Sequence, residues 1–151
     1  MSSDNKELIE LNGIELTKSW FEQAIPNPTI ETACTQIGCA FEETSELAET
    51  IGDDEACLTL SVSAEFYKNK NTYAISDLKA ADRVKILDDI VDEIVTRVGI
   101  AHNLKMDILG ALAEVNRSNF SKFENGKPVF DEQGKITKGK NYTPPDLTPY
   151  I

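Results

Sequence analysis

The hydrophobic positions of the chain recur mostly at the spacing of an α-helix. Five segments follow this pattern, and residues that favour helix ends separate them. The predicted helices run from Ile14 to Ala24, from a cap near Thr29 to Ile51, from Asp53 or Asp54 to the break at residues 69–71, from Ser76 or Asp77 past Val98, and from about Lys105 to Phe123. The pattern therefore predicts an all-α protein built as a bundle of four to five helices.

The fourth predicted helix carries an apolar stripe at positions i, i+4, i+7, i+8 and i+11. The stripe consists of Leu87, Val91, Ile94, Val95 and Val98. An apolar face of this width ordinarily packs against other helices, so we expect it to point inward. Asp89 and Asp92 lie beside this apolar face, so they would flank the contact between the packed helices.

The pattern changes after about residue 123, where glycine, proline and lysine replace the helical repeat. Residues 126–130 and 134–138 predict two short strands joined into a small β-hairpin. An extended tail follows from Tyr142. A chain of 151 residues that is 40% hydrophobic can bury one core. We therefore expect a single domain over residues 1–151, with a helical core at about 14–123 and the hairpin and tail at about 124–151.

The composition excludes several classes of function. A formal net charge of −11 makes nucleic-acid polymers and anionic membranes poor partners. Three cysteines without a CxxC pair, and a single histidine, make a zinc site improbable. The odd cysteine count and the lack of an apolar run near 18 residues favour a soluble protein of the cytoplasm. No calcium-loop motif of the DxDxDG type is present.

Two acidic clusters stand out within predicted helices. They consist of Glu42, Glu43 and Glu46 in the second helix and Asp88, Asp89, Asp92 and Glu93 in the fourth. Like charges four positions apart destabilise a helix by about 0.2–0.5 kcal/mol per pair, and no Lys or Arg lies between Thr29 and Ile51. Uncompensated acids on two helices favour hard divalent cations with oxygen ligands. The alternative is a pair of solvated acidic faces.

The spacing of these acids resembles a known enzyme family. Glu43-x-x-Glu46, followed by Leu47-Ala48-Glu49, and Asp89-x-x-Asp92 on a later helix are similar to the ExxE and ExxD metal motif of the MazG-like all-α nucleoside triphosphate pyrophosphohydrolases. The similarity covers roughly residues 30–125. The second motif begins with Asp89, where the family usually has Glu, so a water could bridge this shorter side chain to the metal.

A second stretch resembles one branch of this family. It comprises residues 115–123 (VNRSNFSKF), then Gly126-Lys127-Pro128 and Gly134-Lys135-Ile136-x-Lys138-Gly139. The stretch is similar to the carboxy-terminal signature of the phosphoribosyl-ATP pyrophosphohydrolase-like branch found in phages and bacteria. The chain is thereby expected to act in a bacterial or phage-infected host cytosol.

The resemblance implies cleavage of a nucleoside triphosphate between its α and β phosphates, which releases the monophosphate and pyrophosphate. It also implies Mg²⁺, with Mn²⁺ as a possible substitute, because a triphosphate approaches carboxylates only through bridging cations. The implied metal ligands are Glu43, Glu46, Asp89 and Asp92. A carboxylate that is not fully used in coordination can accept a proton from water, and Glu43 and Glu46 are both candidates for this base.

Substrate contacts are expected near the end of the fifth predicted helix. Lys122 and Lys138 can bind phosphate oxygens, and Asn116 and Asn119 can share a helix face toward a sugar or base. The alternative for Asn119 and Lys122 is that they only cap the helix end. Trp20, Phe21 and Phe41 could stack on a base, although aromatic residues beside an apolar stripe are more often core residues.

The family further implies a homodimer or homotetramer. The stretch that resembles the phage and bacterial branch favours a deoxynucleotide such as dGTP as the substrate and a role in control of the nucleotide pool. A third possibility is the histidine-pathway enzyme that acts on phosphoribosyl-ATP, which this stretch makes a weaker hypothesis than a deoxynucleotide enzyme. A rival hypothesis from another class is a non-enzymatic acidic helical protein that binds a partner or imitates the charge of DNA. This rival predicts acids spread over the surface and no dependence on a divalent metal.

Overall fold

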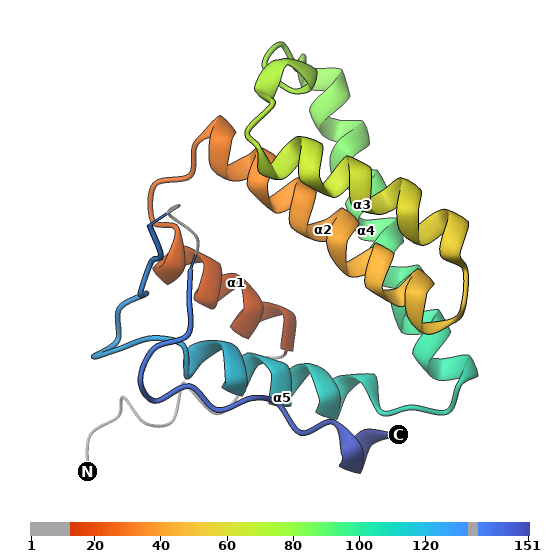
Figure 1. Ribbon diagram of the computed structural model, residues 1–151, viewed down its shortest axis with the longest axis vertical. Helices are drawn as coiled ribbons and strands as arrows, with labels where there is room; N and C mark the ends of the chain where they lie inside the picture. The colour runs from red at the N-terminus through yellow and green to blue at the C-terminus, as the bar shows by residue number, and fades with distance from the viewer. Residues whose placement is uncertain (1–12, 133–135) are drawn as a thin grey trace. The chain divides into compact units, whose positions relative to one another are not determined.

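The structure is a computed structural model that describes residues 13–132 and 136–151. The described residues form five α-helices and no β-sheet, so the all-α class is confirmed (Figure 1). The helices are α1 (Gly13–Ala24), α2 (Ile30–Thr50), α3 (Asp54–Lys68), α4 (Ala80–Asn103) and α5 (Ile108–Phe120), with 3₁₀ turns η3 (Thr72–Ala74) and η4 (Thr148–Tyr150). In the described part of the chain, every helix is too short or too polar to cross a membrane.

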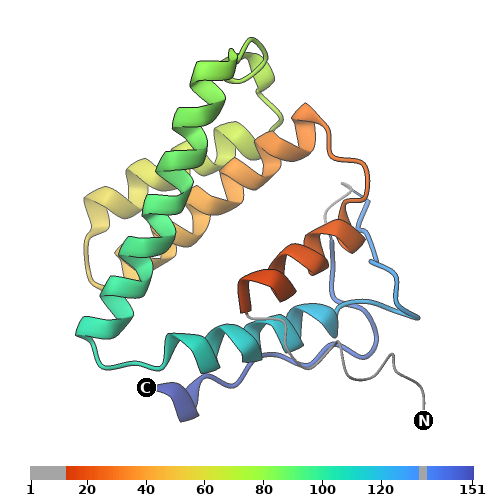
Figure 2. The same ribbon diagram turned by 180° about the vertical axis from the view of Figure 1, so that it is seen from behind.

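The chain divides into two compact units. One unit consists of Asn27–Leu87 and holds α2, α3 and the start of α4. The other consists of the chain up to Pro26 together with Asp88–Ile151, and it holds α1, α5 and the rest of α4. Figure 2 shows α4 as one unbroken helix, so the boundary between the units falls within it.

The pairing of α2 with α3 begins with local signals at their ends. Thr29 caps α2: its hydroxyl accepts a hydrogen bond from the Thr32 N–H, and the Thr32 hydroxyl accepts one from the Thr29 N–H. Gly52 follows α2 with φ +83°, a backbone conformation that glycine adopts readily. The Asp53 carboxylate then accepts from the Ala56 N–H and starts α3. These signals confirm the predicted ends of α2 and the start of α3.

Small residues let α2 and α3 approach closely. A Cβ atom built on Gly38 would lie 2.8 Å from the Ala64 carbonyl oxygen, so only glycine fits at this crossing. The buried Ser45 hydroxyl lies 2.7 Å from the Ser61 hydroxyl and donates to the Cys57 carbonyl at 2.9 Å. Because both partners are satisfied, this polar contact fixes the register of the two helices without leaving a buried group unpaired.

The second unit is built around α1 and α5. Trp20, Ala24 and Phe123 are buried together, and the Trp20 and Phe123 rings stack at 5.8 Å between centroids. The Trp20 indole N–H donates to the Asn119 carbonyl at 3.0 Å, which satisfies its one polar group. Trp20 is therefore a core residue in this structure. Phe41 stacks on Tyr67, across α2 and α3.

The predicted C-terminal hairpin is not supported. In the described residues, Phe130 and Ile136 form one isolated antiparallel bridge, and the Thr137 N–H donates to the Val129 carbonyl at 2.8 Å. Pro128 has no N–H with which to extend the ladder. Gln133 of the expected turn and Gly134 and Lys135 of the expected second strand lie outside the described residues.

The expected inward face of α4 is wrong for the single chain. Its five stripe residues, from Leu87 to Val98, are between 43% and 63% exposed. Among the described residues of α4, Ala101 alone is buried. Helical periodicity shows that a face is apolar, but it does not show what covers that face.

Three predicted helix boundaries also shift. The fourth helix begins at Ala80, a few residues later than expected, after a 3₁₀ turn at Thr72–Ala74. The fifth begins at Ile108, since Lys105 adopts φ +62° and the Asp107 carboxylate caps the new helix through the Gly110 N–H. It ends at Phe120 rather than Phe123.

Candidate functional site

The first acidic pair lies on the outer side of α2. Glu43 and Glu46 are exposed, whereas the intervening Ser45 and the following Ala48 are buried. The helical repeat produces this separation, because residues three apart share a face and the packed positions lie on another. The α2–α3 contact therefore holds the backbone of the pair firmly and leaves both carboxylates open to solvent.

Glu42 behaves differently from its neighbours. Its carboxylate accepts from the Lys68 ammonium at 2.8 Å, and Glu65 lies 3.5 Å from the same nitrogen. The hydrogen bond to Glu42 raises the pKa of Lys68. The sequence suggested that no positive charge relieves this cluster, but α3 supplies one. No local pattern shows this pairing, because Lys68 is 26 positions away.

The second acidic pair lies on α4. Asp89 and Asp92 are exposed, as are their neighbours Asp88 and Glu93. The two pairs belong to different units of the chain, because Glu43 and Glu46 fall in Asn27–Leu87. Within the described residues, no three His, Cys, Asp or Glu side chains are grouped as an ion site. A joint site of four carboxylates stays a prediction.

Asn116 has a packing role that the sequence did not reveal. It is 2% exposed, and its amide N–H₂ donates to the Gly13 carbonyl at 2.8 Å. Its amide oxygen accepts from the Thr17 hydroxyl at 3.0 Å. Both ends of the amide thus connect α5 to α1, and a contact of Asn116 with substrate stays a prediction.

Asn119 and Lys122 form a pair at the end of α5. The Lys122 ammonium donates to the Asn119 side-chain oxygen at 2.8 Å and lies 5.9 Å from the centroid of the Trp20 ring. The Lys138 ammonium lies 4.8 Å from the centroid of the Tyr142 ring. A cation–π contact occupies only one side of an ammonium group, so the other side of each lysine can still face an anion.

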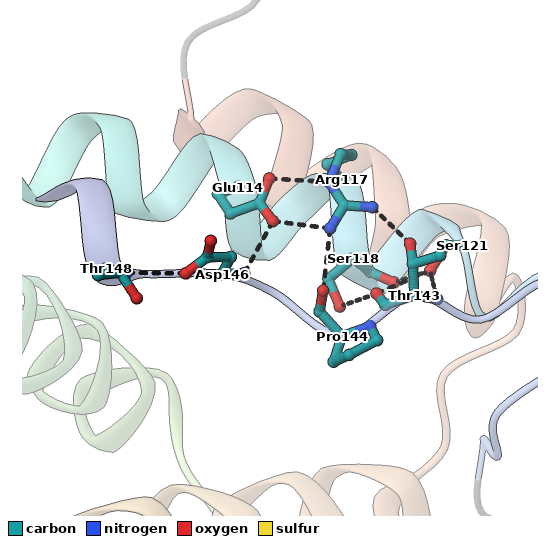
Figure 3. Close-up of polar contacts among 8 residues, drawn as sticks. All are labelled: Glu114, Arg117, Ser118, Ser121, Thr143, Pro144, Asp146 and Thr148. Carbon is teal, nitrogen blue, oxygen red and sulfur yellow. Dashed lines mark hydrogen bonds and ion pairs between the residues drawn. The ribbon is translucent and has the colours of Figure 1, made fainter.

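The C-terminal tail lies along α5 through a polar network that sequence reasoning missed (Figure 3). Arg117 donates to both carboxylate oxygens of Glu114, at 2.7 and 2.8 Å, and also to the Thr143 hydroxyl and the Pro144 carbonyl. The Asp146 N–H donates to Glu114 at 3.0 Å. The Arg117 hydrogen bonds, together with this N–H, lower the pKa of Glu114 to about 2.

Two serines complete the attachment of the tail. The Ser118 hydroxyl donates to the Thr143 carbonyl at 2.9 Å, and the Thr143 N–H donates to the Ser121 hydroxyl at 3.0 Å. Farther along, the Asp107 N–H donates to the Tyr150 carbonyl at 2.8 Å. The only local signal was the sequence of residues 115–123 itself, whose serines and arginine hold the tail in this structure.

Comparison with known proteins gives no match: no family model fits the chain, and no curated protein or solved structure matches it. The chain's own residues are therefore the basis for a functional proposal. The relevant features are the exposed carboxylate pairs of α2 and α4 and the basic groups at the end of α5.

Proposed function

We propose that this protein is a Mg²⁺-dependent nucleoside triphosphate pyrophosphohydrolase of the MazG-like type. It cleaves a nucleoside triphosphate, for example dGTP, into the monophosphate and pyrophosphate. The observation that carries the proposal is the presence of two exposed carboxylate pairs at i, i+3 spacing on two helices. Like-charged carboxylates gathered on one helix repel one another, and a bound cation would relieve this repulsion.

The chemistry of the donor set fits the proposed metal. Glu43, Glu46, Asp89 and Asp92 offer only carboxylate oxygens, which Mg²⁺ and Mn²⁺ prefer, and no imidazole or thiolate accompanies them in either motif. When bound, the metal would polarise the α-phosphate and lower the pKa of a nearby water.

We assign the four carboxylates different roles in binding the cation and in accepting the proton. Glu43 and Glu46 would hold the cation from α2, and whichever of them is less engaged would accept the proton of the attacking water. Asp92 would hold the cation from α4. Asp89 is one methylene shorter than the glutamate usual at this position, so it would act through a bridging water.

Positive charge for the phosphates gathers in one part of the sequence. Residues 117–140 contain six Lys or Arg and three Asp or Glu, whereas the whole chain has a net charge of −11. Lys122 and Lys138 are the members that we propose bind the triphosphate or the leaving pyrophosphate. Exchange of the Asn119 oxygen for a phosphate oxygen would leave the Lys122 hydrogen bond intact and strengthen it, because the acceptor then carries charge.

The biological role that suits this chemistry is control of a deoxynucleotide pool in the cytosol of a bacterium or a phage-infected host. The chain would work as a homodimer or homotetramer, without nucleic-acid polymers or membranes as partners. A panel in which the purine deoxynucleotides are the poorest substrates would contradict dGTP as the substrate and leave the reaction type standing.

One observation favours a second candidate. The acids Asp88, Asp89, Asp92 and Glu93 are all exposed along α4, as expected of an acidic binding protein or an imitator of DNA charge. This candidate requires no divalent metal and no turnover.

The test is product analysis with ³¹P NMR on each common NTP and dNTP, with and without Mg²⁺. The proposal expects pyrophosphate and the monophosphate in equal amounts and only with the metal. Release of inorganic phosphate would point to a different bond, and no release from any nucleotide by folded protein in excess Mg²⁺ would support the acidic binding protein.

A further inference from the structure

Glu124 lies among the lysines that follow α5, although its charge opposes the binding of an anion there. It comes two residues after Lys122 in the sequence, and its carboxylate accepts a hydrogen bond from the Lys140 backbone N–H at 2.7 Å. A carboxylate repels phosphate by the same Coulomb law through which the lysines attract it. The contribution of Glu124 must therefore come from its hydrogen bond and not from its charge.

A tight turn fixes the backbone that carries Glu124. Glu124 and Lys127 exchange two backbone hydrogen bonds, at 2.8 and 3.0 Å, around Asn125 and Gly126. Both residues of the turn have positive φ, +52° and +73°, as expected of a two-residue turn in which Asn-Gly is favoured. The Glu124 side chain thus extends from a defined point of the chain.

Residues 138–140 lie against this turn and against the end of α5. The Gly139 N–H donates to the Lys122 carbonyl at 3.1 Å. A Cβ atom built on Gly139 would lie 2.6 Å from that carbonyl oxygen and 2.8 Å from the Glu124 Cγ atom, so a side chain at this position would separate the two segments. The close approach places the backbone origins of the two proposed phosphate-binding lysines beside each other.

We propose that Glu124 is a positioning residue, whose carboxylate holds residues 138–140 against the end of α5 and so keeps Lys138 beside Lys122 for the phosphates of the substrate. This role rests on the assignment of the two lysines to phosphate in the proposed function. A lysine side chain is long and flexible, so a fixed backbone origin limits the positions that its ammonium group can reach. Glu124 itself contacts no phosphate and acts through the backbone N–H of Lys140.

Two substitutions of Glu124 separate its hydrogen bond from its charge. Glu124→Gln removes the charge and keeps an oxygen that can accept from the Lys140 N–H, so phosphate affinity should equal that of the wild type or rise by up to about threefold. Glu124→Ala removes both the charge and the acceptor, and phosphate affinity should fall by about three- to tenfold. An effect of charge alone predicts tighter binding for both variants.

Titration of the full chain with inorganic pyrophosphate, followed by NMR without a divalent metal, measures these affinities. Gly139→Ala should weaken pyrophosphate binding as Glu124→Ala does, because its Cβ would force residues 138–140 away from Lys122. The matched control is Gly99→Ala, whose Cβ meets nothing within 4 Å and which should leave the affinity within about twofold. Unchanged helical circular dichroism shows that each variant is folded.

The proposal requires that Glu124→Ala bind pyrophosphate more weakly than the wild type and that Glu124→Gln not do so. Any other order of the three affinities, or no binding of pyrophosphate by the wild type, would overturn it. Nucleotide hydrolysis is a separate measurement. A protein that binds pyrophosphate in the expected order but cleaves no nucleotide would contradict the proposed function alone.

Discussion

Helices α2 and α4 carry the same local feature and differ in what lies behind it. Each has two carboxylates one turn apart on an exposed face. In α2 the other side is buried on α3 through Ser45 and small residues, whereas in α4 the apolar stripe is itself exposed. The acidic pair on α2 is thus held by the contact of α2 with α3, whereas the apolar stripe of α4 stays exposed. Equal spacing in sequence therefore does not imply equal support in the fold.

The largest effect is expected from the acidic pair of α2. Glu46→Gln should lower the rate of pyrophosphate release by 10²–10⁴-fold, because the change removes a metal ligand and a candidate base while keeping the side chain's size. Steady-state kinetics with dGTP and Mg²⁺ measures this loss. The matched control is Glu31→Gln on the same helix, which should retain activity within about threefold.

The sequence of each helix was enough to predict the acidic pairs and the helix ends, but not the contacts that other helices make with them. Thr29, Gly52 and Asp53 define helix ends through contacts with near neighbours, so the boundaries of α2 were predictable. Lys68 donates a hydrogen bond to Glu42 from another helix, and no local sequence pattern predicts this contact. The exposure of α4 was missed for the same reason, since burial depends on partners distant in sequence or on another chain.

The candidate substrate residues show this limit as well. The stretch around Asn116 is distinctive in the sequence, but spacing alone does not show which contacts its side chains make within the chain. Asn116 bonds to α1, and the Arg117 side chain holds the tail, through partners about 25 to 100 positions away. Lys122 and Asn119 do bond to each other, as expected for residues three apart at a helix end.

Glycine substitutions sharpen the contrast between the two helices. Gly38→Ala should destabilise the protein by about 1–3 kcal/mol, because the new Cβ would lie 2.8 Å from the Ala64 carbonyl oxygen and push α3 away. Gly99→Ala in α4 meets nothing within 4 Å and should stabilise by about 0.5–1 kcal/mol through helix propensity. Urea unfolding of both variants measures the difference, and equal effects of the same sign would contradict the contrast.

The ion pair behind the α2 acids should contribute less. Lys68→Met removes the partly buried partner of Glu42 and should destabilise by about 1 kcal/mol or less, since such pairs are screened by solvent. Lys85→Met on the exposed side of α4 is the control, with a change expected within about 0.5 kcal/mol. Thermal unfolding at low and high salt checks both. A cost for Lys68→Met that is no larger than the control would contradict a role for this pair.

The smallest effect concerns the tail and depends on pH. Glu114 has its pKa lowered to about 2 in the folded chain, chiefly by the Arg117 hydrogen bonds. The attachment it supplies is therefore fully present above pH 4.5 and is lost as the pH falls toward 2. The protection factor of the Asp146 amide, which is its intrinsic exchange rate divided by the rate observed by NMR, should fall over this window. In Glu114→Gln this protection factor should no longer change with pH, and a profile like that of the wild type would contradict the assignment.

The most direct test of the account asks whether the acidic pairs of α2 and α4 form one cation site. Mn²⁺ affinity would be measured by calorimetry for the wild type, Glu43→Gln, Asp92→Asn and the double variant. A shared site predicts that each single change weakens binding by about 10- to 100-fold and that the double variant loses far less than the product of the two. Losses that multiply independently, or affinity unchanged by either substitution, would contradict a shared site.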